Sequence, residues 1–344
     1  MQTRERLSNF ELLRIIAMFM ILLIHANYFS LGIPTAEDLQ KDTLPTLLRF
    51  FGQSLCTGAV DTFVLISGWF GIRASLKGGC KLLFQCFFIM ILVYFACILL
   101  GKASFNVKGI KACFMMNKDI WFIKAYLGLY LLSPFLNAYL EKATNRQLIS
   151  FLLAFYLFQS LYGWITDAAA FIKTGYSVFS FIGLYVLAHA CRRNIDKLQK
   201  HQGYVYGISY LMIILLITTI ATIGAYKGTN FWGALFMKYT SPFVILSSMV
   251  LVYWFSTFSI RSKTINTIAV SSLSIYLIHM HSCVKDIYRN EIRLIWLSYP
   301  HLTSILIILA FCMGVFVFCV LVDRIRIICW GFLKNRINKT SLSK

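Results

Sequence analysis

Ten apolar stretches, each near the length needed to cross a lipid bilayer, dominate this chain of 344 residues. A helix rises about 1.5 Å per residue, so roughly 20 apolar residues span the hydrocarbon core of a membrane. We therefore predict an all-α, polytopic membrane protein with about ten transmembrane helices. The stretches lie approximately at Phe10–Leu31, Leu47–Phe70, Leu82–Leu100, Trp121–Leu140, Leu148–Trp164, Tyr176–Ala190, Val205–Tyr226, Tyr239–Phe258, Ile265–Cys283 and Leu302–Val322.

Composition supports a membrane protein with a single domain. Hydrophobic residues make up 59% of the chain and charged residues only 13%, whereas soluble domains carry about 25% charged residues. The breaks between apolar stretches are short and contain no linker or low-complexity tract, so we interpret residues 1–344 as one membrane domain. The first stretch ends without a small-residue cleavage site, and we expect it to be a retained span rather than a signal peptide.

The distribution of lysine and arginine predicts the orientation in the membrane. With the N-terminus inside, the cytoplasmic segments carry 19 of these residues and the opposite side carries 12. This bias places both termini in the cytoplasm. The segment from Lys102 to Lys118 fits poorly because it would be external and yet holds four lysines, so either it is a functional basic loop or one span is misassigned. The net charge of +20 indicates contact with anionic lipid, and no soluble basic module is present to bind nucleic acid.

Several kinds of site are missing from the sequence. The ten cysteines contain no C-x-x-C pair, and we interpret them as small apolar fillers rather than as a disulfide or metal framework. No zinc-ligand spacing, glycine-rich phosphate loop, G-x-S-x-G turn or kinase signature occurs. We expect no metal and no nucleotide-driven chemistry.

The first span carries ionisable residues at membrane depth, where they are costly and usually functional. Arg14 and His25 are eleven residues apart, which places them on one helical face about 16 Å apart along the axis. Glu11 lies one turn before Arg14, so one interpretation of these two is an ion pair that anchors the helix end. His25 is either a site of chemistry or a hydrogen-bonded packing residue, and its sequence context leaves both open.

Two other spans carry polar residues. Asp61 falls near mid-membrane in the second span, seven residues before Gly68, with Ser67 beside that glycine. Asp61 either orients and charge-stabilises His25 or anchors neighbouring helices by hydrogen bonds.

The ninth span places Tyr276 and His279 on one polar face, for which helix packing and direct catalysis are both open. The aromatic residues at the span ends fit either an interfacial belt or a glycan-stacking surface. They include Trp121, Trp164, Tyr176 and Trp232, with Asp167 nearby.

Four segments resemble the acyltransferase-3 family of integral membrane acyltransferases, and they occur in the same order as in that family. They are Asn9–Ala17 with His25 following, Val60–Gly68, Trp121–Asn137 and Ser274–His279. The resemblance implies a ten-helix domain that moves acyl groups, commonly acetyl from cytoplasmic acetyl-coenzyme A, onto hydroxyls of cell-surface polysaccharides. It also implies that His25 is the essential histidine of the first span and Arg14 its accompanying arginine.

The chain departs from this family in two respects. Many members have an arginine pair after the second span, where this sequence offers Arg73 with Lys77 and Lys81. Lysines meet phosphate as point charges and lack the bidentate fork of arginine. An appended esterase-like domain is also missing, so we expect the membrane domain to complete the transfer itself.

We therefore expect an O-acyltransferase, acting with acetyl-coenzyme A on a glycan or lipid-linked oligosaccharide at the bacterial plasma membrane. Coenzyme A phosphates would meet Arg14, Arg73, Lys77 or Lys81, and His25 would act as general base or transient acyl carrier with Asp61 holding its tautomer. The alternative is a transporter or flippase for a lipid-linked saccharide, in which His25 and Asp61 relay protons. A purely structural partner in glycan export would leave the buried ionisable residues unexplained.

Overall fold

The computed structural model describes residues 7–198 and 202–341, and every regular element in them is a helix. The prediction of an all-α fold is confirmed for this part of the chain. Arg4, Arg6, Lys200 and Lys344, which contribute to the predicted charge bias, lie outside the described residues.

Each of the ten apolar stretches coincides with helix, though the first, second and ninth are each divided between two α-helices. The helices of the first half are α1 (Ser8–Ala26), α2 (Tyr28–Leu31), α3 (Ala36–Lys41), α4 (Thr43–Thr57), α5 (Ala59–Phe70), α6 (Leu76–Leu99), α7 (Val107–Cys113) and α8 (Trp121–Lys142). The helices of the second half are α9 (Asn145–Gln159) with its π-helical extension Ser160–Ile165, a short 3₁₀ turn at Lys173–Gly175, α10 (Val178–Arg193), α11 (Ile195–Leu198), α12 (Gly203–Tyr226), α13 (Phe231–Phe236), α14 (Pro242–Ser256), α15 (Lys263–Ala269), α16 (Ser272–His279), α17 (Lys285–Ser298) and α18 (His301–Ser341).

Six helical segments are long and apolar enough to cross a membrane. They are Ser8–Leu31, Thr43–Phe70, Leu76–Leu99, Asn145–Ile165, Gly203–Tyr226 and His301–Leu333. The other predicted spans fall on α8, α10, α14 and the pair α15 and α16, which are shorter or more polar. The structure is therefore that of a multi-pass membrane protein, while ten spans and cytoplasmic termini remain predictions.

Glycines allow close helix approaches around the second apolar stretch. At the break between α4 and α5, a Cβ on Gly58 would lie 2.4 Å from Ser248 Oγ, and this hydroxyl donates to the Gly58 carbonyl. Near the end of α5, a Cβ on Gly68 would lie 2.4 Å from the carbonyl oxygen of Tyr185 on α10. The predicted role of Gly68 in permitting a close neighbour is confirmed, and α5 is fixed against both α10 and α14.

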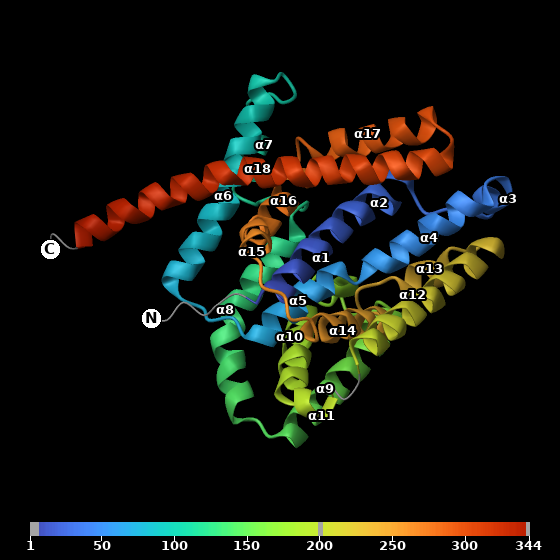
Figure 1. Cartoon of the computed structure of the whole chain (residues 1–344), viewed down its shortest axis with the longest axis horizontal. Helices are drawn as coiled ribbons and strands as arrows, with labels where there is room; N and C mark the ends of the chain where they lie inside the picture. The colour runs from blue at the N-terminus through green and yellow to red at the C-terminus, as the bar shows by residue number, and fades with distance from the viewer. Residues whose placement is uncertain (1–6, 199–201, 342–344) are drawn as a thin grey trace.

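The first helix lies in the middle of the bundle, where it packs against α4, α5, α16 and α18 (Figure 1). In the same view, α17 runs alongside the long α18, and α2, α3 and α13 gather at the far end of the bundle from the N-terminus. We call the end at which α1 begins the Ser8 end and the opposite end, where α2 stops, the Leu31 end. Because α1 runs between these two ends, one of its faces can line a cavity near each end of the bundle.

Candidate active site

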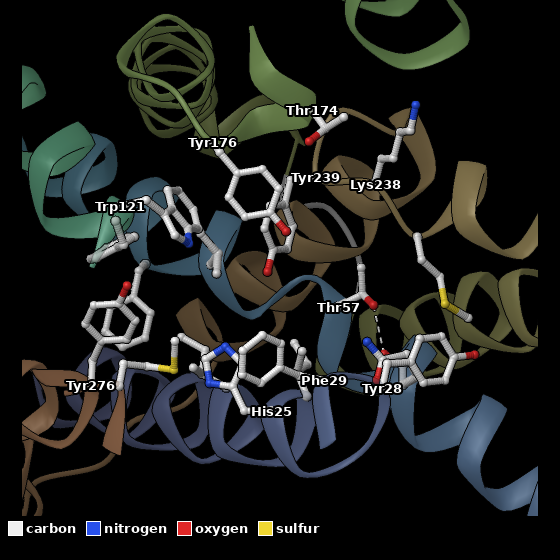
Figure 2. A pocket seen from close by; sticks show the side chains of 18 of the residues that line it. His25, Tyr28, Phe29, Thr57, Trp121, Thr174, Tyr176, Lys238, Tyr239 and Tyr276 are labelled. Atoms are coloured by element: carbon white, nitrogen blue, oxygen red, sulfur yellow. Dashed lines mark hydrogen bonds between the residues drawn. The ribbon is translucent and has the colours of Figure 1, made fainter. Parts of the chain in front are cut away.

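His25 lies on the wall of a cavity of about 600 Å³ toward the Leu31 end of the bundle. Its walls come from α1, α2, α4, α5, the start of α8, α13, α16, and the segments that precede α10 and α14. We call it the Leu31-side cavity. Figure 2 shows His25 on its floor, with Tyr176 and Tyr239 across from the imidazole and Tyr276 to one side.

His25 and His279 form a hydrogen-bonded pair that fixes the tautomer of both rings. His25 Nδ1 is 2.8 Å from His279 Nε2, and His279 Nδ1 is 2.7 Å from the carbonyl oxygen of Ile275. A carbonyl only accepts, so His279 Nδ1 carries a proton, and the Nε2 of a neutral His279 accepts from His25 Nδ1. His25 Nε2 is then left with a lone pair and no hydrogen-bond partner among the described residues.

Both imidazoles are neutral in this arrangement, because no described carboxylate contacts either ring and a buried, unpaired imidazolium would be costly. His279 is only 1% exposed, and the ring of Tyr288 packs against it with a centroid separation of 6.0 Å. Tyr288 is itself held by a 2.8 Å hydrogen bond to the carbonyl of Leu22 on α1. The pair therefore presents an imidazole lone pair on the wall of the cavity, an arrangement that suits a general base.

The expectation that Asp61 orients His25 is wrong, because His279 occupies that position. Asp61 is 1% exposed near the start of α5, and its Oδ2 has no hydrogen-bond partner among the described residues. Asp61 lies near the hydroxyls of Tyr156 and Tyr239, on α9 and just before α14. The break at Gly58 starts a new helix three residues before Asp61, and no described hydrogen bond joins this carboxyl to the imidazole of His25.

A second cavity, of about 470 Å³, lies toward the Ser8 end, and we call it the Ser8-side cavity. Arg14 and Glu11 line it and form the predicted ion pair, with Arg14 Nη1 2.5 Å from Glu11 Oε1. Lys81 and Ser67 also line it, and the Ser67 hydroxyl lies 3.3 Å from that of Tyr126. The predicted shared face of Arg14 and His25 is confirmed, since this face of α1 lines both cavities.

The two cavities meet at an apolar constriction. Met18, Phe63 and Phe122 line both cavities, and the rings of the two phenylalanines lie 6.2 Å apart in an edge-on arrangement. Met18 lies between Arg14 and His25 on α1. A linear ligand that reached from one cavity to the other would pass these three side chains.

The predicted group of phosphate-binding residues is divided in the structure. Lys81 lines the Ser8-side cavity, but Arg73 lines a neighbouring basic cavity of about 440 Å³ together with Arg192 and Arg193 of α10. Lys77 is exposed on the first turn of α6 and lines neither cavity, so its predicted grouping with Arg73 and Lys81 is wrong. Phe70 and Gly71 line both the basic cavity and the Ser8-side cavity, so the two cavities adjoin along this turn.

The aromatic candidates also separate into two groups. Trp121 and Tyr176 line the Leu31-side cavity with ring centroids 4.3 Å apart, and Tyr239 lies 5.1 Å from Tyr176. Trp164 instead donates its indole N–H to the carbonyl of Leu235 at 2.9 Å, a packing role. Trp232 is 48% exposed, and neither it nor Asp167 lines this cavity.

Some functional-site residues escape sequence reasoning. Tyr28, Gln53 and Thr57 line the Leu31-side cavity. Gln53 and Thr57 could have been found from the sequence, because their four-residue spacing places them on one helix face. Arg326 follows the last predicted span, which ends at Val322, but it is 2% exposed within α18 and lines the Ser8-side cavity. Its Nε and Nη2 bind both carboxylate oxygens of Asp323 at 2.9 and 2.6 Å. In the described part of the chain, no group of three His, Cys, Asp or Glu side chains could hold a metal ion.

A family model described as an acyltransferase domain matches residues 7–324, nearly the whole chain. The chain belongs to the acyltransferase-3 family. No curated protein and no solved structure matches it. Membership makes this chain a membrane acyltransferase in general terms, and the resemblance noted from the sequence is confirmed.

Proposed function

We propose that this acyltransferase transfers an acetyl group from acetyl-coenzyme A to a sugar hydroxyl of a cell-surface polysaccharide or its lipid-linked precursor. The observation that carries the proposal is the Nε2 lone pair of His25, whose ring is fixed by the hydrogen bond to His279. His25 lines one cavity, and the second cavity begins at Met18 on the same helix. A base between two cavities is the arrangement needed when two substrates approach from opposite sides.

The donor binds at the Ser8 end, which the charge bias predicts to be cytoplasmic. Its phosphates meet the arginines of the basic cavity, Arg73, Arg192 and Arg193, and its uncharged arm follows the Ser8-side cavity past Lys81 and Arg14. The Glu11 carboxylate holds the Arg14 guanidinium in place. The thioester then passes Met18, Phe63 and Phe122 to reach His25.

Chemistry takes place at the Leu31-side cavity. The acceptor hydroxyl donates its proton to His25 Nε2 while its oxygen attacks the thioester carbonyl, and a C–O bond forms. The tetrahedral intermediate collapses with cleavage of the C–S bond, and the leaving thiolate takes the proton from His25 Nε2. Meanwhile His279 accepts the Nδ1 hydrogen bond and stabilises the imidazolium that forms during the step.

Purified protein in nanodiscs with labelled acetyl-coenzyme A tests the proposal. We expect label to appear on surface glycan that has first been freed of acetyl groups by mild alkali. A flippase would move the glycan across the bilayer without labelling it, and a structural export partner would do neither. The relay alternative also needs Asp61 beside His25, and the hydrogen bond of His25 goes to His279 instead.

A further inference from the structure

The Leu31-side cavity has polar groups with unused hydrogen-bonding capacity on two sides of His25. Gln53 Oε1 and the Tyr28 hydroxyl have no hydrogen-bond partner among the described residues, and the Tyr276 hydroxyl lies beside the Phe122 backbone with its proton still to donate. All three side chains line this cavity. Gln53 is 7% exposed and Tyr276 is 4% exposed. Buried polar groups in proteins are nearly always satisfied, so three groups with unused capacity around one cavity point to a ligand that carries hydroxyls.

These atoms are arranged on either side of the base. Gln53 and Thr57 are one turn apart on α4, and the Thr57 hydroxyl donates to the Gln53 carbonyl at 2.8 Å. Figure 2 shows Thr57 and Tyr28 on one side of His25 and Tyr276 on the other. If a ligand hydroxyl were bound at His25, the ligand hydroxyls on either side of it would therefore lie near polar protein groups.

The charges of this cavity favour a neutral ligand. Among the described residues that line it, the only side chains that carry a charge at neutral pH are Asp119 and Lys238. Asp119 is 2.6 Å from Lys285 Nζ, and Lys238 is 3.7 Å from an Asp167 oxygen. Since both charges are already paired, a phosphate or carboxylate ligand would find no available counter-ion here.

The wall opposite His25 is aromatic. Trp121, Tyr176 and Tyr239 present clustered rings there, and the apolar C–H face of a sugar ring packs well on such a surface. Hydroxyl-binding groups beside the base and rings across from it together match a flat, neutral polyol.

We propose that Gln53 and Tyr28 on one side, and Tyr276 on the other, bind the hydroxyls that flank the acylated hydroxyl, and so select the position of acylation on a neutral sugar ring. This inference rests on the proposed function, since it needs the Leu31-side cavity to hold the acceptor. Gln53 and Tyr28 are then specificity-determining residues that touch the acceptor and not the donor.

Gln53→Leu and Tyr28→Phe test the inference, because each removes hydrogen-bonding atoms with little change in size. The probe is the alkali-treated surface polysaccharide of the source cell, with acetyl-coenzyme A and purified protein in nanodiscs. We expect each substitution to raise the KM for polysaccharide about tenfold and to leave the KM for acetyl-coenzyme A unchanged. NMR of the product should show acetyl groups at more than one hydroxyl.

Gln159→Leu and Tyr253→Phe are the matched controls. Gln159 Oε1 is also buried without a described partner, and the Tyr253 hydroxyl is buried beside Cys191, but neither residue lines this cavity. We expect both controls to retain the wild-type KM values and a single acetylation position. Tyr28→Phe removes one oxygen atom, so it remains informative if Gln53→Leu folds poorly.

The outcomes separate this inference from the proposed function. If the wild type acetylates the polysaccharide and Gln53→Leu and Tyr28→Phe do so with unchanged acceptor KM and position, the inference is wrong and the proposed function stands. A fall in kcat with both KM values unchanged also overturns it, since that result assigns these residues to the chemical step. Failure of the wild type to transfer acetyl defeats the proposed function and the inference together.

Discussion

The cavities on either side of Met18 differ in charge although they share one face of α1. The Leu31-side cavity has both of its charged side chains paired and keeps polar atoms without partners. The Ser8-side cavity has an excess of basic side chains: Lys81 lies there with Arg14, which is paired with Glu11, and Arg326, which is paired with Asp323. It adjoins a cavity lined by three more arginines. One side is suited to a neutral hydroxylated ligand and the other to an anion.

Under the proposed function, one short constriction would keep the two substrates apart. Met18, Phe63 and Phe122 are apolar, so they would confine the donor phosphates to the Ser8 side and let the uncharged thioester arm pass. The base lies just beyond the constriction, where the arm would meet the acceptor. Substitutions on the two sides should therefore affect different kinetic constants, and substitutions at the base should affect the shared chemical step.

The largest effect is expected at the base that serves both cavities. His25→Ala should lower kcat at least about 1000-fold, because it removes the group that takes the acceptor proton. Expression and insertion should persist, since loss of an imidazole makes an apolar helix easier to insert. Initial transfer rates at matched protein amounts measure this effect. His301→Ala, which alters a partly exposed histidine paired with Asp42, is the control, and near-normal transfer by His25→Ala would end the catalytic interpretation.

The next effect concerns the partner of that base. His279→Ala should lower kcat about 100-fold with the KM values of both substrates unchanged, because His25 Nδ1 loses its acceptor and the tautomer is no longer fixed. His279→Gln should recover much of the rate, since its side-chain oxygen can accept the same hydrogen bond. A structural role alone would instead give equal losses in both variants, together with a lower thermal midpoint in each.

A smaller effect, confined to the donor, is expected on the Ser8 side. Lys81→Gln should raise the KM for acetyl-coenzyme A about fivefold and leave the acceptor KM unchanged, because a remote cationic contact contributes binding that is nearly equal in ground and transition states. Lys77→Gln, one turn earlier on α6, should change it less than twofold, since Lys77 lines neither cavity. Equal shifts in the two variants would show that the donor lies along the exposed face of α6 instead.

Much of the fold could be predicted from the sequence because the membrane requirement acts locally. A run of apolar residues determines where a helix forms, and all ten runs coincide with helix. The division of the ninth run into α15 and α16 depends on packing between distant helices, which periodicity does not report. The apolar pattern also fails to predict where α18 ends. Its apolar run stops near Val322, but the helix continues to Ser341, and Arg326 is buried against Asp323.

The candidate site was predicted less completely, because its partners come from distant parts of the chain. His25 and Arg14 could be found from one helix, since a charged group at membrane depth is informative by itself. The predicted pairing of His25 with Asp61 rests on their similar depth in the membrane. Similar depth does not mean that two side chains face each other, because each can point in any direction around its helix axis. The hydrogen bond to His279 joins residues 254 positions apart, so only the three-dimensional structure identifies it.

The smallest effect should be seen at Asp61, and it distinguishes depth from contact. Asp61→Asn keeps the size of the side chain, and no described interaction joins Asp61 to His25, so kcat should fall less than about threefold. In a double-mutant cycle with His279→Ala, the two losses should multiply, because sites without shared partners act independently. Initial rates in nanodiscs with normalised protein provide the measurement. The opposite result would be a loss in Asp61→Asn as large as that in His279→Ala, with no further loss in the double variant. Asp61 and His279 would then act as one unit, and the group of residues that supports the base would include Asp61 of α5.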